Sequence, residues 1–151
     1  MKHSAFQWRP HTPAAENARN ALPKLVAEYF KAGRKLNAES AAKAMHGFRL
    51  KTKHLRYTLE LFTPLYGPGL QVRIERLRPI QNALGELNDC AVLLSELGKR
   101  LTPEARAYVQ KRGGEKHREF LRYWQEEFDA ADEEKKWTQY LTRFARTGNR
   151  K

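Results

Sequence analysis

The side chains with the clearest chemistry lie between residues 40 and 59. This stretch has no acidic residue, but it holds five Lys or Arg residues and two His residues. They are Lys43, His46, Arg49, Lys51, Lys53, His54 and Arg56. Lys and Arg donate charge-assisted hydrogen bonds to anionic oxygens, and the planar Arg side chain can bind one phosphate with two of them. The stretch therefore predicts a site for a polyanion.

The spacing of this stretch predicts an amphipathic helix over about residues 39–65. An apolar stripe follows the helical repeat at Met45, Phe48, Leu55, Leu59 and Phe62. A polar stripe lies one residue later, at His46, Arg49, Lys53, Arg56 and Glu60. Because each residue turns the helix by about 100°, the polar stripe lies beside the buried face rather than opposite it. We call His46, Arg49, Lys53 and Arg56 the basic rail.

Like charges along the basic rail repel one another and need a compensating negative charge. The rail spans roughly 15 Å at the helical rise per residue. Glu60 supplies one counter-charge, acidic residues of other helices could supply more, and a bound polyanion could supply the rest. The pattern also fits a solvated face whose Lys and Arg stems cover apolar surface. Spacing alone leaves both interpretations open.

A second polar stripe follows on the next predicted helix. Arg78, Gln81, Gly85 and Asn88 recur with the helical repeat, one step from a stripe of leucines. The amides of Gln81 and Asn88 could bind phosphate oxygens or satisfy buried polar groups. Gly85 lowers helix stability by about 1 kcal/mol, so we expect it to mark close packing.

Helical periodicity elsewhere predicts an all-α protein, an antiparallel helical bundle of four to five helices. We expect residues 1–20 to form an irregular arm, residues 21–146 a single bundle, and residues 147–151 a basic tail. Asn20 is the predicted cap of the first helix, and Pro79 is predicted to divide the third.

Three features are predicted for the C-terminal half. Thr102-Pro103-Glu104 is typical of a helix start, and Gly113-Gly114 is expected to weaken the helix that follows. The acidic cluster at residues 126–134 is expected to form a turn and balance charge rather than hold Mg²⁺.

Length and charge bound the possible functions. The chain has 151 residues, which suits one domain, and a net charge of +12. Such a charge attracts nucleic acid, inorganic polyphosphate or an anionic membrane surface. The single Cys90 excludes an intrachain disulfide framework and a Cys-rich zinc site. No apolar run suits a signal peptide or a membrane span, so we expect a cytoplasmic protein without a membrane partner.

Two separated motifs resemble the CHAD family, the conserved histidine α-helical domain. The first has the pattern H-x-x-R-x-x-x-K-x-x-R-Y and is carried by His46, Arg49, Lys53, Arg56 and Tyr57. After Tyr66-Gly67, the second is carried by Gln81, Leu84, Gly85, Leu87, Asn88 and Asp89. The resemblance covers about residues 40–97, because order and spacing agree in both motifs.

The resemblance implies a helical bundle that binds inorganic polyphosphate through a basic channel, in some members on polyphosphate granules. It assigns anion binding to His46, Arg49, Lys53 and Arg56. The full predicted site adds Lys51, His54, Tyr57, Arg78, Gln81 and Asn88. Family members usually contain two such halves, whereas this chain shows one. The half therefore either stands alone with an open groove or pairs with a second chain as a homodimer.

No catalytic signature is present, so we expect no enzyme activity and no cofactor. His46 and His54 differ in direction by about 80° on a helix and have no nearby third ligand, so no metal site is predicted. Nucleic-acid backbone binding is the alternative function. It is less favoured because Tyr57 is the one aromatic residue of this helix expected outside the core stripe, and base stacking needs such rings.

Overall fold

The structure is a computed structural model, and it describes residues 8–145. All regular elements in this range are helical, which confirms the predicted all-α fold. The five longer helices are α1 (Ala14–Arg34), α2 (Ala42–Leu61), α5 (Arg78–Leu97), α6 (Pro103–Tyr123) and α7 (Glu133–Arg143). The shorter elements are α3 (Thr63–Tyr66), α4 (Pro68–Glu75), a 3₁₀ turn (Gly98–Arg100) and a π-helical turn (Trp124–Phe128). None of the described helices has the length and apolar character needed to span a membrane.

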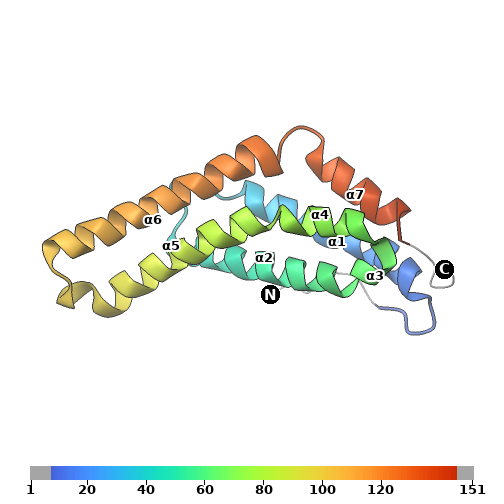
Figure 1. Ribbon diagram of the computed structural model, residues 1–151, viewed down its shortest axis with the longest axis horizontal. Coiled ribbons are helices and arrows are strands. Elements are labelled where there is room, and N and C mark those ends of the chain that lie inside the picture. The colour runs from blue at the N-terminus through green and yellow to red at the C-terminus, as the bar shows by residue number, and fades with distance from the viewer. Residues whose placement is uncertain (1–7, 146–151) are drawn as a thin grey trace.

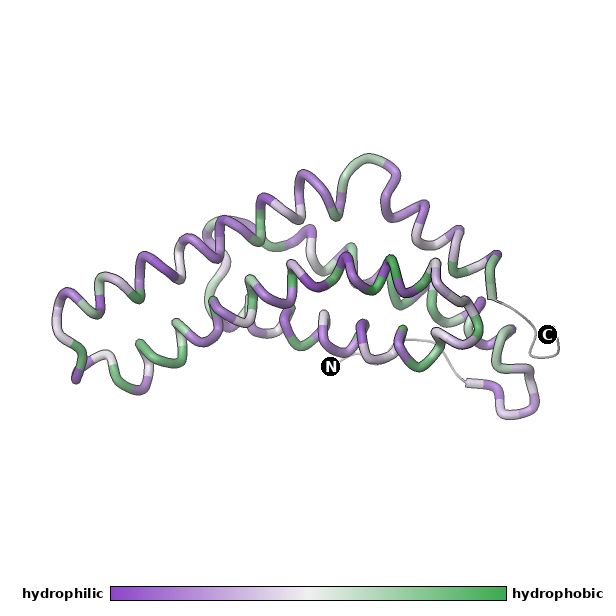
Figure 2. Tube along the Cα trace, viewed as in Figure 1, coloured by the Kyte–Doolittle hydropathy of each residue, from purple (hydrophilic) through white to green (hydrophobic). Residues whose placement is uncertain are grey.

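The bundle is elongated (Figure 1). Helices α5 and α6 form an antiparallel hairpin that extends beyond the other helices at one end of the molecule. At the other end, α1 packs against α2 and α7, and α2 also packs against α5. Hydrophilic and hydrophobic residues alternate along every helix in Figure 2, as expected of amphipathic helices in a bundle.

An aromatic cluster forms the core where these helices meet. Tyr29 of α1 stacks on Phe48 of α2 with ring centroids 4.7 Å apart, and Phe30 stacks on Phe128 at 4.9 Å. Trp124 contacts several of these rings. Aromatic side chains bury much apolar area each, so this cluster fixes the position of α2 against α1 and the end of α6.

The first helix begins earlier than predicted. Helix α1 starts at Ala14 with Pro13 at its N-cap, so the predicted irregular arm is wrong for the residues from Ala14 onward. Pro23 lies inside the helix rather than in its first turn. The predicted tail, residues 147–151, lies outside the described residues.

Asn17, rather than Asn20, stabilises the start of α1. Its buried amide Nδ2 donates to the carbonyls of Arg9 and Thr12 at 2.9 and 3.1 Å, and its Oδ1 accepts from the Arg9 amide at 3.1 Å. These bonds satisfy polar groups of the preceding loop, which is why the helix can begin before Asn20.

The second half of the chain follows the predictions more closely. Pro79 lies in the first turn of α5 and separates it from α4, and Thr102 Oγ1 accepts from the Ala105 amide at 3.1 Å. Helix α6 continues through Gly113-Gly114, so the predicted weakening does not interrupt the helix. Gly113 is buried, and a Cβ built on it would lie 3.4 Å from Cys90 Cβ, so this glycine brings α6 close to α5.

The acidic cluster forms ion pairs with arginine side chains of the same chain. Arg34 of α1 pairs with Asp129 at 2.7 Å and with Glu134 at 3.1 Å, and Arg76 pairs with Glu133 at 2.6 Å. The described residues contain no group of His, Cys, Asp and Glu side chains arranged to hold a metal ion. The cluster therefore fixes the turn before α7 against α1 and the end of α4.

Replacing Gly33 tests the aromatic core. A Cβ at Gly33 would overlap the indole ring of Trp124, so we expect Gly33→Ala to lower the free energy of unfolding by about 1–3 kcal/mol. Gly47→Ala is the matched control, because nothing lies within 4 Å of a Cβ there. It should raise stability by about 0.5–1 kcal/mol through helix propensity. Urea unfolding followed by circular dichroism measures both, and equal effects would contradict the close contact with Trp124.

Candidate functional site

The two polar stripes meet where α2 and α5 pack antiparallel. Arg56 Nη1 donates to Gln81 Oε1 at 2.6 Å. Seven residues earlier on α2, Arg49 lies opposite Gly85, with its Nε 3.9 Å from a Cβ built on that glycine. These two contacts set the register of the helix pair. We call the strip formed by the basic rail together with Arg78, Gln81, Gly85 and Asn88 the seam.

Arg49 has an unusual environment within the seam. Its side chain is half-buried, and its Nε is buried without a hydrogen-bond partner among the residues that the structure describes. A buried donor without a partner destabilises a protein by about 1–3 kcal/mol. The described residues thus leave this donor uncompensated at the centre of the cationic row.

Arg56 is held in place by neighbouring side chains. Besides its bond to Gln81, its Nε lies 3.3 Å from Glu60 Oε1, and its guanidinium carbon lies 4.9 Å from the centre of the Tyr57 ring. The contact with Glu60 is an ion pair that lacks hydrogen-bond geometry, since Nε is among the buried atoms without a hydrogen bond. Arg56 is therefore positioned in advance, with part of its charge neutralised.

Charge along the seam is uneven. Of the basic-rail residues, only Arg56 forms an ion pair within residues 8–145, while Lys53 is half-buried and His46 is exposed. On α5, Arg78 forms a two-point ion pair with Glu75, at 3.0 and 3.2 Å. The positive charge is thus least compensated at His46, Arg49 and Lys53.

Three of the predicted site residues occupy other positions. By helical geometry, Lys51 and His54 lie about 140–160° around α2 from Arg49, and both are exposed. The structure does not bring them to the seam. Tyr57 is 49% exposed beside the seam and contacts it through Arg56. Asn88 is half-buried on the turn of α5 after Gly85, toward the His46 end of the seam.

Gly85 leaves space rather than allowing close packing. The nearest heavy atom to a Cβ at this position is Arg49 Nε at 3.9 Å, which is an ordinary contact. The predicted close approach of two helices at this glycine is therefore wrong. The glycine leaves room beside Arg49 for a side chain as small as a methyl group.

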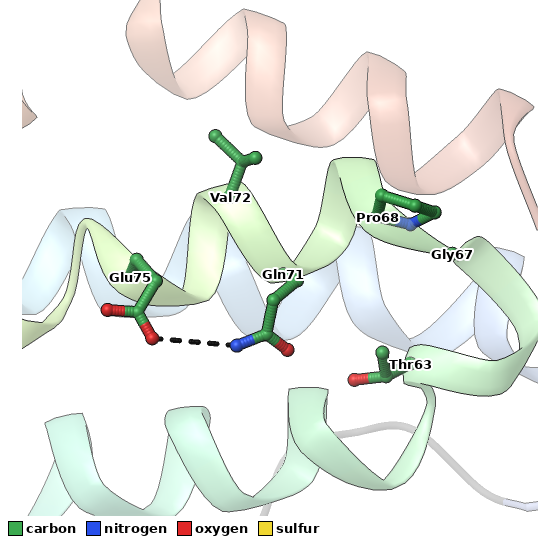
Figure 3. Close-up of a pocket in the computed structure, with 6 residues that line it drawn as sticks. All are labelled: Thr63, Gly67, Pro68, Gln71, Val72 and Glu75. Atoms are coloured by element: carbon green, nitrogen blue, oxygen red, sulfur yellow. Dashed lines mark hydrogen bonds between the residues drawn. The ribbon is translucent and has the colours of Figure 1, made fainter.

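Glu75 is a residue in contact with the seam that sequence reasoning missed. Glu75 lies three residues before Arg78, a spacing that favours an ion pair within one helix. The two residues belong to different helices, α4 and α5, so the rule for a single helix did not predict their contact. Glu75 also borders a shallow apolar hollow of about 590 Å³ beside α4 (Figure 3). The lining of this hollow contains no cationic side chain, so it does not suit phosphate.

Comparison with known proteins bears on what the seam could bind. Residues 2–98 match the sequence model of the CHAD domain. The chain belongs to the CHAD domain family. The match covers both helices of the seam, α2 and α5, and ends just after α5. All residues of the seam therefore lie inside the matched range. Neither the curated proteins nor the solved structures contain a match to this chain.

Replacing Arg49 by an apolar side chain of similar length tests whether its donor is unsatisfied. We expect Arg49→Met to leave the free energy of unfolding unchanged or to raise it by about 1 kcal/mol, because a buried donor without a partner is removed. Arg34→Met is the matched control and should lower stability, because it breaks the pairs with Asp129 and Glu134. Urea unfolding compares the two. A clear loss of stability in Arg49→Met would mean that Arg49 has a structural partner in solution.

Proposed function

We propose that this CHAD protein is a non-catalytic protein that binds inorganic polyphosphate along the seam between α2 and α5. The observation that carries the proposal is Arg49, whose buried Nε has no hydrogen-bond partner among residues 8–145 and which lies between His46 and Lys53, two residues without an ion pair in the same range. Membership of the CHAD family supports polyphosphate as the ligand, because this family is related to polyphosphate binding.

The geometry of the seam suits a linear polyanion. Successive residues of the basic rail are separated by about 4.5–6 Å along the helix axis, so a chain of phosphates meets a cation at every turn. Arg can bind two oxygens of one phosphate, and Lys acts as a mobile point charge. On the α5 side of the seam, the amides of Gln81 and Asn88 can donate further hydrogen bonds to phosphate oxygens.

Nucleic acid fits the seam less well. Single-stranded nucleic acid is usually bound by cations together with aromatic rings that stack on bases. Tyr57 is the exposed aromatic residue next to the seam, and its ring is already in contact with the Arg56 guanidinium. The seam therefore offers many contacts to phosphate and no free aromatic ring on which a base could stack among its own residues.

Substitutions along the seam test the site. We expect the combined Arg49→Ala, Lys53→Ala and Arg56→Ala variant to lose polyphosphate affinity by about 100-fold or more, since charge-assisted hydrogen bonds contribute about 1.5–3 kcal/mol each. Isothermal titration calorimetry measures the affinity, and far-UV circular dichroism checks that helicity is retained. Lys53→Ala and Lys51→Ala form a matched pair on the same helix. The first should weaken binding and the second should not, and equal losses would contradict the seam as the site.

Competition tests the ligand class. Binding of polyphosphate should weaken steeply as salt increases, because each neutralised phosphate releases counterions. At equal phosphate concentration and equal salt, single- or double-stranded nucleic acid should not displace long-chain polyphosphate. Displacement would show instead that the protein binds nucleic-acid backbone.

We further propose that two chains pair to enclose the ligand, and that the complex lies in the cytoplasm on polyphosphate granules, as the resemblance to the CHAD family implies. The support for pairing is that the seam is open to solvent on one side. Leu50, Tyr57 and Leu61 also expose 46%, 49% and 79% of their surface on the adjoining face of α2. Apolar side chains exposed together favour association.

Light scattering coupled to size exclusion tests the pairing. With tripolyphosphate, which is too short to bridge two separate seams, we expect the mass of two chains. Leu61→Glu should reduce the mass to that of one chain without loss of helicity, because this side chain is largely exposed in the single chain. The mass of one chain for the unmodified protein at saturating ligand would refute pairing.

A further inference from the structure

The seam has two halves that differ in their charge compensation. His46, Arg49 and Lys53 form an open half, in which no ion pair is found among the described residues. Arg56 and Arg78 form a paired half at the opposite end of the seam, where Glu60 and Glu75 lie against them. The carboxylates occupy positions next to the guanidinium groups that a phosphate would take.

The two acidic contacts are built differently. Glu75 meets Arg78 through both of its carboxylate oxygens, at 3.0 and 3.2 Å, which is the geometry in which Arg binds phosphate. Its Oε1 also accepts a long hydrogen bond from Gln71 at 3.5 Å, which Figure 3 shows from the side of α4. Glu60 meets Arg56 one helical turn away, at 3.3 Å. Both carboxylates are 44–48% exposed, so an incoming anion can reach and displace them.

We propose that Glu60 and Glu75 act as internal phosphate mimics that set how binding depends on polyphosphate chain length. A short chain occupies the open half and leaves both ion pairs intact. A long chain extends into the paired half and must displace the two carboxylates from Arg56 and Arg78. The gain in affinity with chain length is therefore smaller than the number of cations would suggest. This inference rests on the proposed polyphosphate function.

The physical reason lies in competition between anions. An exposed ion pair contributes at most about 1 kcal/mol, so displacement is possible but lowers the net gain. The displaced carboxylates stay nearby and favour release of the long chain. Removing either carboxylate leaves its Arg free for phosphate without changing the open half.

The experiment measures affinity for tripolyphosphate and for long-chain polyphosphate by calorimetry, in buffer of physiological ionic strength, with Glu60→Gln, Glu75→Gln and their combination. We expect affinity for the long chain to rise roughly two- to fivefold for each carboxylate removed, and affinity for tripolyphosphate to stay unchanged. The ratio of the two affinities is the readout, because a general loss or gain of folding stability changes both in the same direction.

Glu104→Gln is the charge-matched control. Glu104 is exposed in the first turn of α6, at the far end of the hairpin from the paired half, and it should leave both affinities unchanged. An unchanged ratio in the Glu60 and Glu75 variants, with normal binding by the unmodified protein, would overturn the mimic role alone. Absence of binding to either polyphosphate by the unmodified protein would overturn the proposed function itself and this inference with it.

Discussion

Burial of one face of α2 is the constraint on which the site depends. Phe48 packs on Tyr29, Phe120 and Trp124, and Leu55 and Leu59 are almost fully buried. Since the basic rail follows this apolar stripe by one residue, burying the stripe forces the cations to the edge of the core. Helix α5 closes that edge, so the cations lie in a seam between two helices.

Buried polar groups of the core beside α2 form hydrogen bonds with one another. Thr52 donates its hydroxyl proton to the carbonyl of Phe48, so the Tyr29 hydroxyl is the donor in its 2.8 Å hydrogen bond to Thr52 Oγ1. Burial raises the pKa of the Tyr29 hydroxyl well above its usual value, so this group stays protonated and paired. The hydroxyls of Tyr29 and Thr52 beside α2 are thus paired, whereas the buried Nε atoms of Arg49 and Arg56 have no hydrogen-bond partner among the described residues. Two unsatisfied donors along one cationic row support the proposal that a ligand completes the site.

The acidic residues of the turn before α7 pair with cations outside the seam. The carboxylates of Asp129, Glu133 and Glu134 pair with Arg34 and Arg76 around the turn before α7. They hold the C-terminal helix against α1 and α4 and are not available to the seam. Within the seam, the positive charge is therefore least compensated in the open half, where no ion pair is found among the described residues.

Much of this protein follows from local sequence, because helices depend on residues three and four positions apart. The all-α fold, the division at Pro79, the cap at Thr102 and the position of the basic rail beside the apolar stripe of α2 were all predictable. The start of α1 was not, because it depends on the side chain of Asn17 reaching back to Arg9. The continuity of α6 at Gly113 was not either, because it depends on packing against Cys90.

By itself, the sequence determined that a row of cations lies at the edge of a buried helix face. Only the tertiary structure decided what that row faces. The contact between Arg56 and Gln81 joins residues 25 positions apart, and the space left by Gly85 matters only because Arg49 lies opposite. The ion pair of Glu75 with Arg78 likewise depends on the angle between α4 and α5. Such contacts arise from how helices pack, and helix packing is set by the whole core rather than by the spacing within one helix.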